Sequence, residues 1–447
     1  MHDPQPDVWH KLRAEFAAGR QWVDRGVVLG YAVLTGCIVV GFTLLGERAS
    51  EAFRHVGLAS ALGPWLTLLW TPAVAVAVLW WTRRFVPGAA GSGIPAVIAA
   101  LDDLLPEERR PRFVSLRLAM HKIGLVSGSL LAGLSVGREG PTVQVGAGVM
   151  LHAQRWLSPR AGIDAHDLMV AGAAAGIAAA FNTPLGGLIF ALEQLSRRRQ
   201  ATHSATVLIS IVLAGLVAVS VFGNVSHFGQ LRVQHLGLEL LGPGLLVALS
   251  AGIAGGLLSR LVVASARGLP DRFSRWRAQH PLRFGAGCAL AVAVIGITSN
   301  GATSGAGYEP TRALLEGSSE APGVFTLLKF CATWLSVWSG VPGGIFAPSL
   351  AIGASLGHDI ALVTGVGAEA AIPLIALGMV GFLAAATQGP ITAFIIVMEM
   401  VAGHAMVLSL MASALLASGV ARWIAGSLYV DLAGLLMLPT EPPDTRR

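Results

Sequence analysis

The sequence has few charged residues. Lys and Arg number 31, Asp and Glu number 25, and together they make up 13% of the 447 residues, against roughly 25% in an average soluble domain. This excludes an ordinary soluble protein, and 54% apolar residues exclude a disordered chain. Nine runs of 20 or more residues lack these four residue types: 26–46, 55–82, 168–192, 201–231, 240–259, 284–308, 330–358, 370–398 and 401–421. Each is long enough to cross a bilayer core, which takes about 20 helical residues. We therefore predict an all-α polytopic membrane protein.

Cysteine is scarce as well. Cys37, Cys288 and Cys331 lie far apart in apolar sequence, without CxxC spacing or a histidine at metal-ligand spacing. We therefore expect no metal and no organic cofactor. The net charge of +6 comes from cations that lie between apolar runs, where they orient a membrane protein. It does not indicate a nucleic-acid partner.

The chain divides into two halves that repeat. We take Pro141 and Pro348 as zero points. Five features then recur in the same order: a lysine 19 residues before, a glycine four before, a glycine five after, a second proline 43 or 42 after, and a glutamate nine beyond that proline. The pairs are Lys122 and Lys329, Gly137 and Gly344, Gly146 and Gly353, Pro184 and Pro390, and Glu193 and Glu399. Such an internal repeat is typical of transporters, whose inverted halves bring broken helices together near the bilayer midplane.

This gives a domain organisation with five parts. We expect a cytoplasmic N-terminal tail at 1–25, because these residues are polar and lack the apolar core of a signal peptide. The first transmembrane half follows at 26–222, a linker at 223–237, the second half at 238–435 and a short C-terminal tail at 436–447.

Three Gly- and Pro-rich segments interrupt the apolar sequence. They are GSGIP at 91–95, GREGP at 137–141 and GGIFAP at 343–348. Proline is favoured in the first turn of a helix, so each segment reads as a loop that opens a helix inside the membrane. The unpaired N–H groups and the positive dipole end of such a helix attract anions. Partial charges can replace the hydration of a small monovalent anion and still let it leave, as conduction requires.

These motifs, in this order and with Tyr429 near the C-terminus, resemble the CLC family of chloride channels and proton-coupled chloride exchangers. The similarity covers residues 26 to 435, and Ala171 to Phe190 also matches the family. The resemblance implies chloride as substrate, protons as a second substrate of the exchangers, a homodimer in the lipid bilayer with one pore in each chain, and a bacterial inner-membrane location.

The resemblance also assigns the site. A central anion site would be formed by the hydroxyls of Ser92 and Tyr429 and the backbone N–H groups of Ile345 and Phe346. An outer site would use the N–H groups around Arg138, Glu139, Phe346 and Ala347. Glu139 would act as the gate: its carboxylate competes with chloride for the site, and protonation neutralises it.

One position departs from the family's exchangers. Gln194 stands where they have the glutamate that passes protons on the cytoplasmic side, and an amide does not titrate near neutral pH. Our main expectation is chloride transport with doubtful proton coupling, and the alternative is a proton-coupled chloride antiporter. A passive channel, a weakly coupled exchanger, and an exchanger that uses Glu193 or a water chain remain open.

A different class of function is an intramembrane enzyme with Ser92 or Ser135 as nucleophile. Such chemistry needs an activating base and an orienting group, and none of the three motif segments contains a histidine. We expect the protein not to be an enzyme. For Lys122 and Lys329 a structural role is favoured over a functional one, and for Glu193 and Glu399 the two roles stand even.

Overall fold

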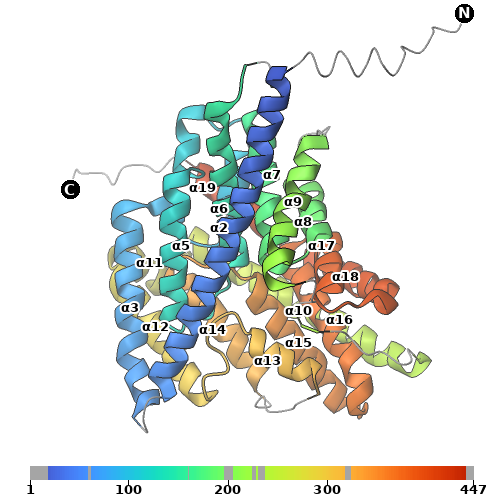
Figure 1. Cartoon of the computed structure of the whole chain (residues 1–447). Coiled ribbons are helices and arrows are strands. Elements are labelled where there is room, and N and C mark those ends of the chain that lie inside the picture. Colours follow the sequence, from blue (N-terminus) through green and yellow to red (C-terminus); the bar gives the residue numbers. More distant parts are fainter. Residues whose placement is uncertain are drawn as a thin grey trace, which may run out of the picture.

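The computed structural model describes residues 19–58, 62–159, 161–195, 205–223, 228–229, 237–317 and 324–438. Within these ranges the regular structure is helical, as predicted (Figure 1). The α-helices are α2 Gly19–Leu58, α3 Gly63–Phe85, α4 Ile94–Ala100, α5 Leu116–Leu131, α6 Glu139–His152, α7 Ala165–Phe181, α8 Pro184–Phe190, α9 Ala205–Phe222, α10 Leu241–Arg267, α11 Arg272–Gln279, α12 Pro281–Thr298, α13 Tyr308–Leu315, α14 Phe325–Ser339, α15 Phe346–Val363, α16 Ala368–Thr387, α17 Pro390–Met400, α18 Val407–Arg422 and α19 Leu428–Met437. Short helical turns are η1 Pro87–Ala89, η2 Glu107–Arg112, η3 Ala153–Trp156, η4 Ala191–Leu195, η5 Leu238–Leu240 and η6 His404–Met406.

Eight helices in the described part of the chain are long and apolar enough to cross a membrane: Gly19–Gly57, Gly63–Phe85, Ala205–Phe222, Leu238–Arg267, Pro281–Thr298, Phe346–Val363, Ala368–Thr387 and His404–Arg422. Several shorter apolar helices pack among them, including α7, α8 and α17. The chain is a polytopic helical membrane protein, as the scarcity of charge predicted.

Some of the nine charge-free runs divide between two helices, although each is long enough to cross the bilayer core. Run 168–192 breaks between α7 and α8, run 330–358 breaks between α14 and α15, and run 370–398 breaks between α16 and α17. The breaks follow from backbone preferences. Asn182 and Gln388 end α7 and α16 in the left-handed conformation, and a proline opens the next helix two residues later.

The repeat is visible in the packing of the two halves. Helix α6 packs against α7, and α15 packs against α16, through facing glycines. A Cβ atom at Gly146 would collide with the carbonyl oxygen of Gly172, and one at Gly353 would collide with that of Gly378. Glycine at these positions therefore lets the helix backbones touch, as in other membrane helix pairs.

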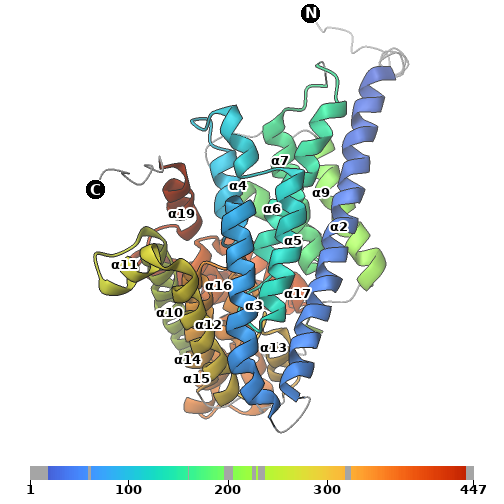
Figure 2. The same cartoon turned by 90° about the vertical axis from the view of Figure 1, so that its left-hand side faces the viewer.

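The two halves are inverted with respect to each other. Helix α4 in the first half and α13 in the second both follow a glycine-rich loop. Figure 2 shows α4 toward the end of the molecule at which α2 starts, and α13 toward the opposite end. The basic segment Glu107–Arg112 follows α4, so by the positive-inside rule the α4 end faces the cytoplasm.

The boundaries of the predicted parts differ in detail. Helix α2 already begins at Gly19, inside the predicted tail 1–25, and α19 continues to Met437. Helix α9 ends at Phe222 and η5 starts at Leu238, on either side of the predicted linker. Of the linker 223–237 the structure describes only residues 223, 228, 229 and 237, and most of both predicted tails lies outside the described residues.

Candidate anion pathway

The three glycine-rich segments meet at one place. The N–H of Gly343 donates to the carbonyl of Gly91 at 3.1 Å, and Gly137 and Gly344 exchange two N–H···O bonds of 2.7 Å. Gly91 pairs with Pro342 in a parallel bridge, and Gly137 with Gly344 in an antiparallel one. Gly137 and Gly344 are equivalent positions of the repeat, so their reciprocal bonds lie at the junction between the two halves.

Each segment opens a helix whose start has no side-chain cap. Helices α4, α6 and α15 follow Gly93, Arg138 and Ile345, and none of these N-cap side chains bonds to the first turn. The first N–H groups of a helix have no partner within the helix. Around Phe346 and Glu139 these donors are buried in the protein, which is the environment in which they attract an anion most strongly.

Two buried hydroxyls complete this donor set. The Oγ of Ser92 and the phenolic oxygen of Tyr429 are buried and have no hydrogen-bond partner in the protein. Ser92 Oγ lies against Gly140 in the first turn of α6, where a Cβ would collide with it. The ring of Tyr429 stacks on Phe346, with centroids 6.1 Å apart and planes 5° from parallel. Buried polar groups are nearly always satisfied, so two hydroxyls beside helix starts fit an anion that accepts from both.

The guanidinium of Arg138 is bonded to residues outside this donor set. Its guanidinium donates to the carbonyl of Thr43 at 3.0 Å and to the carboxylate of Glu47 at 2.9 Å, both on α2. The side chain is 4% exposed. The resemblance assigned only the backbone N–H of this residue to the outer site, and in the structure the guanidinium bonds to α2 while its Nε faces the Glu139 carboxylate.

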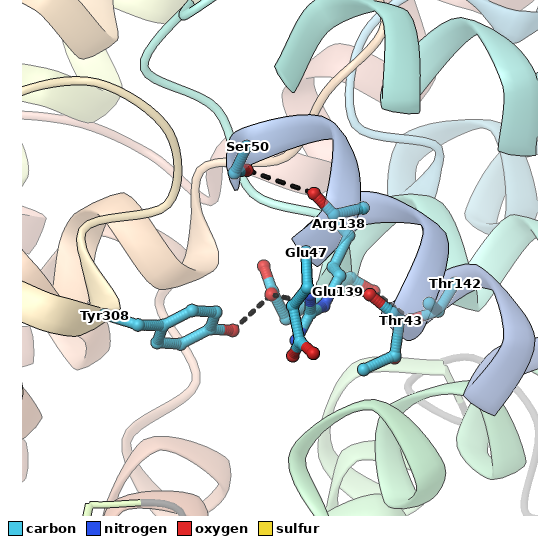
Figure 3. A network of polar contacts seen from close by, with 8 residues as sticks. Thr43, Glu47, Ser50, Arg138, Glu139, Thr142 and Tyr308 are labelled. Carbon is cyan, nitrogen blue, oxygen red and sulfur yellow. Dashed lines mark hydrogen bonds and ion pairs between the residues drawn. The ribbon is translucent and has the colours of Figure 1, made fainter. Parts of the chain in front are cut away.

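Glu139 is fully buried and occupies the first position of α6. Its Oε1 accepts a hydrogen bond from the hydroxyl of Tyr308, and it lies 3.9 Å from Nε of Arg138 (Figure 3). Its Oε2 has no hydrogen-bond partner and lies against Gly137, close to Ala347. The predicted gate is therefore at the junction of the two halves, beside the outer set of helix starts.

The sequence reasoning missed Tyr308. A signal was present: GAGYEP at 305–310 resembles GSGIP at 91–95. The alignment of the halves on Pro141 and Pro348 concealed it, because the two loops lie 31 and 24 residues before their lysines.

The two buried lysines anchor these two loops. Lys122 donates to the carbonyls of Ala89 and Gly91 at 2.8 and 2.7 Å. Lys329 donates to the carbonyls of Thr303 and Gly305, both at 2.8 Å. The structural role favoured for both lysines agrees with these bonds.

The inner proton-path candidates lie at the end of α8. Gln194 is buried in the π-helical turn η4, and neither polar atom of its amide has a hydrogen-bond partner. The carboxylate of Glu193 accepts from the N–H groups of Ile391 and Thr392, at 3.0 and 2.7 Å, in the first turn of α17. Glu193 therefore caps a helix of the other half.

Comparison with known proteins bears on the assignment of this site. The family model of voltage-gated chloride channels matches residues 74–422. The chain belongs to the CLC family. The H(+)/Cl(-) exchange transporter ClcA of Cronobacter sakazakii is 30% identical over 422 residues, which cover 89% of this chain and 87% of that protein. The ClcA of a Vibrio cholerae strain is 31% identical over 404 residues, 86% of this chain and 83% of that protein.

Solved structures of CLC proteins share the fold. A slow cyanobacterial Cl-/H+ antiporter superposes with a TM-score of 0.75 at 23% identity, covering 93% of this chain and 98% of that one. A CLC-type fluoride/proton antiporter gives 0.71 at 23% identity, covering 90% and 95%. Helical bundles of this kind reside in the bacterial inner membrane, so the predicted location agrees with the eight apolar helices and the bacterial relatives.

Membership of a transport family also decides the enzyme alternative. The relatives are transporters, and the CLC chain described here is not an enzyme. The hydroxyl of Ser135, one of the two serines considered as nucleophile, shares a 2.9 Å hydrogen bond with the hydroxyl of Thr333, and its N–H donates to the hydroxyl of Ser336 at 3.0 Å.

Proposed function

We propose that this protein is a proton-coupled chloride antiporter of the bacterial inner membrane. The observation that carries the proposal is the buried carboxylate of Glu139 beside unsatisfied anion donors. The names of the ClcA relatives support exchange over a passive channel. This is the alternative of the sequence analysis, preferred here to its main expectation of doubtful coupling.

Chloride would bind the inner site through the hydroxyls of Ser92 and Tyr429 and the N–H groups of Ile345 and Phe346. The outer site would use the N–H groups around Arg138, Glu139, Phe346 and Ala347. A carboxylate and a chloride carry the same charge and compete for the same donors. When Glu139 takes up a proton it becomes neutral and no longer competes with chloride for those donors. Chloride binding and carboxylate binding therefore alternate with the protonation of one residue. That alternation is what couples the two fluxes.

The inner proton route must differ from that of exchangers with a glutamate at position 194. Gln194 cannot donate and accept protons near neutral pH, and Glu193 is engaged in the cap of α17. A route past the Gln194 amide through water leaves the cap intact and is the simplest that the contacts support. Assembly as a homodimer remains a prediction.

The test uses purified protein in liposomes with an outward chloride gradient and a pH electrode outside. We expect the wild type to drive protons uphill while chloride runs down. Glu139→Ala removes the gate carboxylate, so chloride efflux should persist when valinomycin is present while proton pumping disappears.

Gln194→Ala and Glu193→Gln separate the inner routes. A water route past residue 194 predicts that Gln194→Ala still pumps protons, whereas a route through Glu193 predicts that Glu193→Gln stops the pumping. Chloride efflux without proton movement in the wild type would reject antiport in favour of an uncoupled pathway.

A further inference from the structure

The gate carboxylate is held by a residue of the other half. Tyr308, at the start of α13, donates its hydroxyl hydrogen to Oε1 of Glu139 (Figure 3). The guanidinium of Arg138 lies over the Tyr308 ring, 5.5 Å from its centroid, and the ring centroids of Phe228 and Tyr308 are 5.8 Å apart. Tyr308 is therefore fixed by contacts on its ring while its hydroxyl reaches the gate.

The loop that carries Tyr308 is the repeat counterpart of the loop that carries Ser92. Gly91 and Gly305 have φ of 65° and 63°, and Gly93 and Gly307 have φ of 99° and 87°, values that favour glycine. In both loops the first of these glycines accepts a hydrogen bond from a buried lysine.

The Tyr308 loop is also tied down from outside. Glu309 forms an ion pair with Arg54 of α2. Lys329 and Arg54 thus hold the segment that carries Tyr308 at two places.

The carboxylate is bonded to Tyr308 and not to the anion donors. Among the described residues, the hydrogen bonds of the Glu139 carboxylate include none from the N–H groups of Phe346 or Ala347. The carboxylate lies beside these N–H groups, but its hydrogen bond goes to Tyr308, which leaves the N–H groups to chloride.

We propose that Tyr308 is a positioning residue whose hydrogen bond keeps the charged Glu139 carboxylate from accepting from the neighbouring anion donors. Without this hydrogen bond the carboxylate accepts from the neighbouring N–H groups, and the fraction of protein able to bind chloride falls. A hydrogen bond to a charged group is strong enough to change such a population about tenfold or more, and the apparent chloride affinity falls by the same factor. The proposal rests on the gate role of Glu139 proposed above.

The experiment is a double-mutant cycle of Tyr308→Phe and Glu139→Ala. Phenylalanine keeps the ring under Arg138 and removes only the hydroxyl. In protein with Glu139, we expect Tyr308→Phe to lower chloride efflux from liposomes about tenfold. In the Glu139→Ala background the same change should leave efflux within about twofold, because no carboxylate remains to be held.

A merely structural tyrosine would lower efflux equally in both backgrounds, and that result, or no effect in either, overturns the proposal. Tyr31→Phe is the matched control, since the Tyr31 hydroxyl bonds His152 at 3.0 Å, away from the gate; it should behave as the wild type.

Chloride titration calorimetry on the same four proteins gives a second readout that needs no transport. We expect about tenfold weaker chloride binding on Tyr308→Phe only where Glu139 is present. If the wild type moves no chloride but shows this pattern, the proposed function fails and the role of Tyr308 stands. If the wild type moves chloride but the four proteins do not show this pattern, the proposed function stands and the role of Tyr308 fails.

Discussion

At the scale of single residues, two glutamates each cap a helix of the opposite half. Glu193 accepts from the first turn of α17, and Glu399 accepts from the N–H groups of Leu185 and Gly186 in the first turn of α8, at 3.3 and 2.7 Å. Each carboxylate lies nine residues after the proline that opens its own helix. A carboxylate at a helix N-terminus meets both the unpaired N–H groups and the positive dipole end.

Removing one of these caps should weaken the fold. Glu399→Ala removes the acceptor of the exposed Leu185 N–H and of the partly buried Gly186 N–H, and we expect a loss of about 1–3 kcal/mol of stability. Glu399→Gln keeps one acceptor oxygen and should lose less. Thermal unfolding in detergent measures the order, with the exposed Glu108→Gln as control. Equal melting temperatures for all three variants would contradict the capping role.

Some of the residues at the junction of the two halves could be located from the sequence, and others could not. The repeat spacing located both lysines, both glutamates and the Gly137–Gly344 pair, because these residues bond to backbone groups at equivalent places in the two halves. Tyr308 was invisible to it, since its loop stands at a different distance from its lysine and the partner, Glu139, is 169 residues away. The loop itself could be recognised from GAGYEP at 305–310, but a contact across 169 residues leaves no local pattern.

At the scale of elements, glycine decides which helices touch. Gly353 of α15 faces the backbone of Gly378 in α16, and no side chain separates the two helices there. The charge-free runs could not predict this arrangement. They also hid α14, whose 15 residues include the buried charge of Lys329, and they merged α7 with α8. A scan for charge-free runs treats a buried lysine such as Lys329 as the end of a membrane span, although it lies inside a helix.

Gly353→Ala should therefore be costly. The added Cβ meets the carbonyl oxygen of Gly378 and the neighbouring backbone, which cannot move without separating the helices, and overpacking of this kind costs about 1–3 kcal/mol. At Gly124 in α5 an added Cβ meets no atom within 4 Å, so Gly124→Ala should hold or raise the melting temperature. Similar losses in both variants would show that helix contact is not the cause.

At the scale of the whole molecule, neither half is complete alone. The first half supplies Ser92 and Glu139, and the second supplies Tyr308, Phe346 and Tyr429. Each half also provides hydrogen-bond partners for backbone groups of the other. These bonds are those of the Gly137–Gly344 pair and those from helix starts to the carboxylates of Glu193 and Glu399.

A chain divided between residues 229 and 237 tests this dependence. We expect the two fragments to co-purify and to restore chloride efflux when they are produced together, while either fragment produced alone is degraded or aggregates. Co-purification on a tag placed on one fragment is the measurement. A first half that is monodisperse by itself would show that the exchanged contacts are dispensable.

The divergence of the two glycine loops has a consequence for ancestry. If the repeat arose by gene duplication, the precursor was a pair of identical chains, and Gly137 and Gly344 were then one residue bonding to its own copy. Such a pair carries the same side chains on both membrane faces, whereas here Ser92 stands opposite Ala306 and Tyr308 stands opposite Ile94. A serine at the cytoplasmic loop with a tyrosine at the opposite one became accessible only after fusion, when each copy could mutate without changing the other.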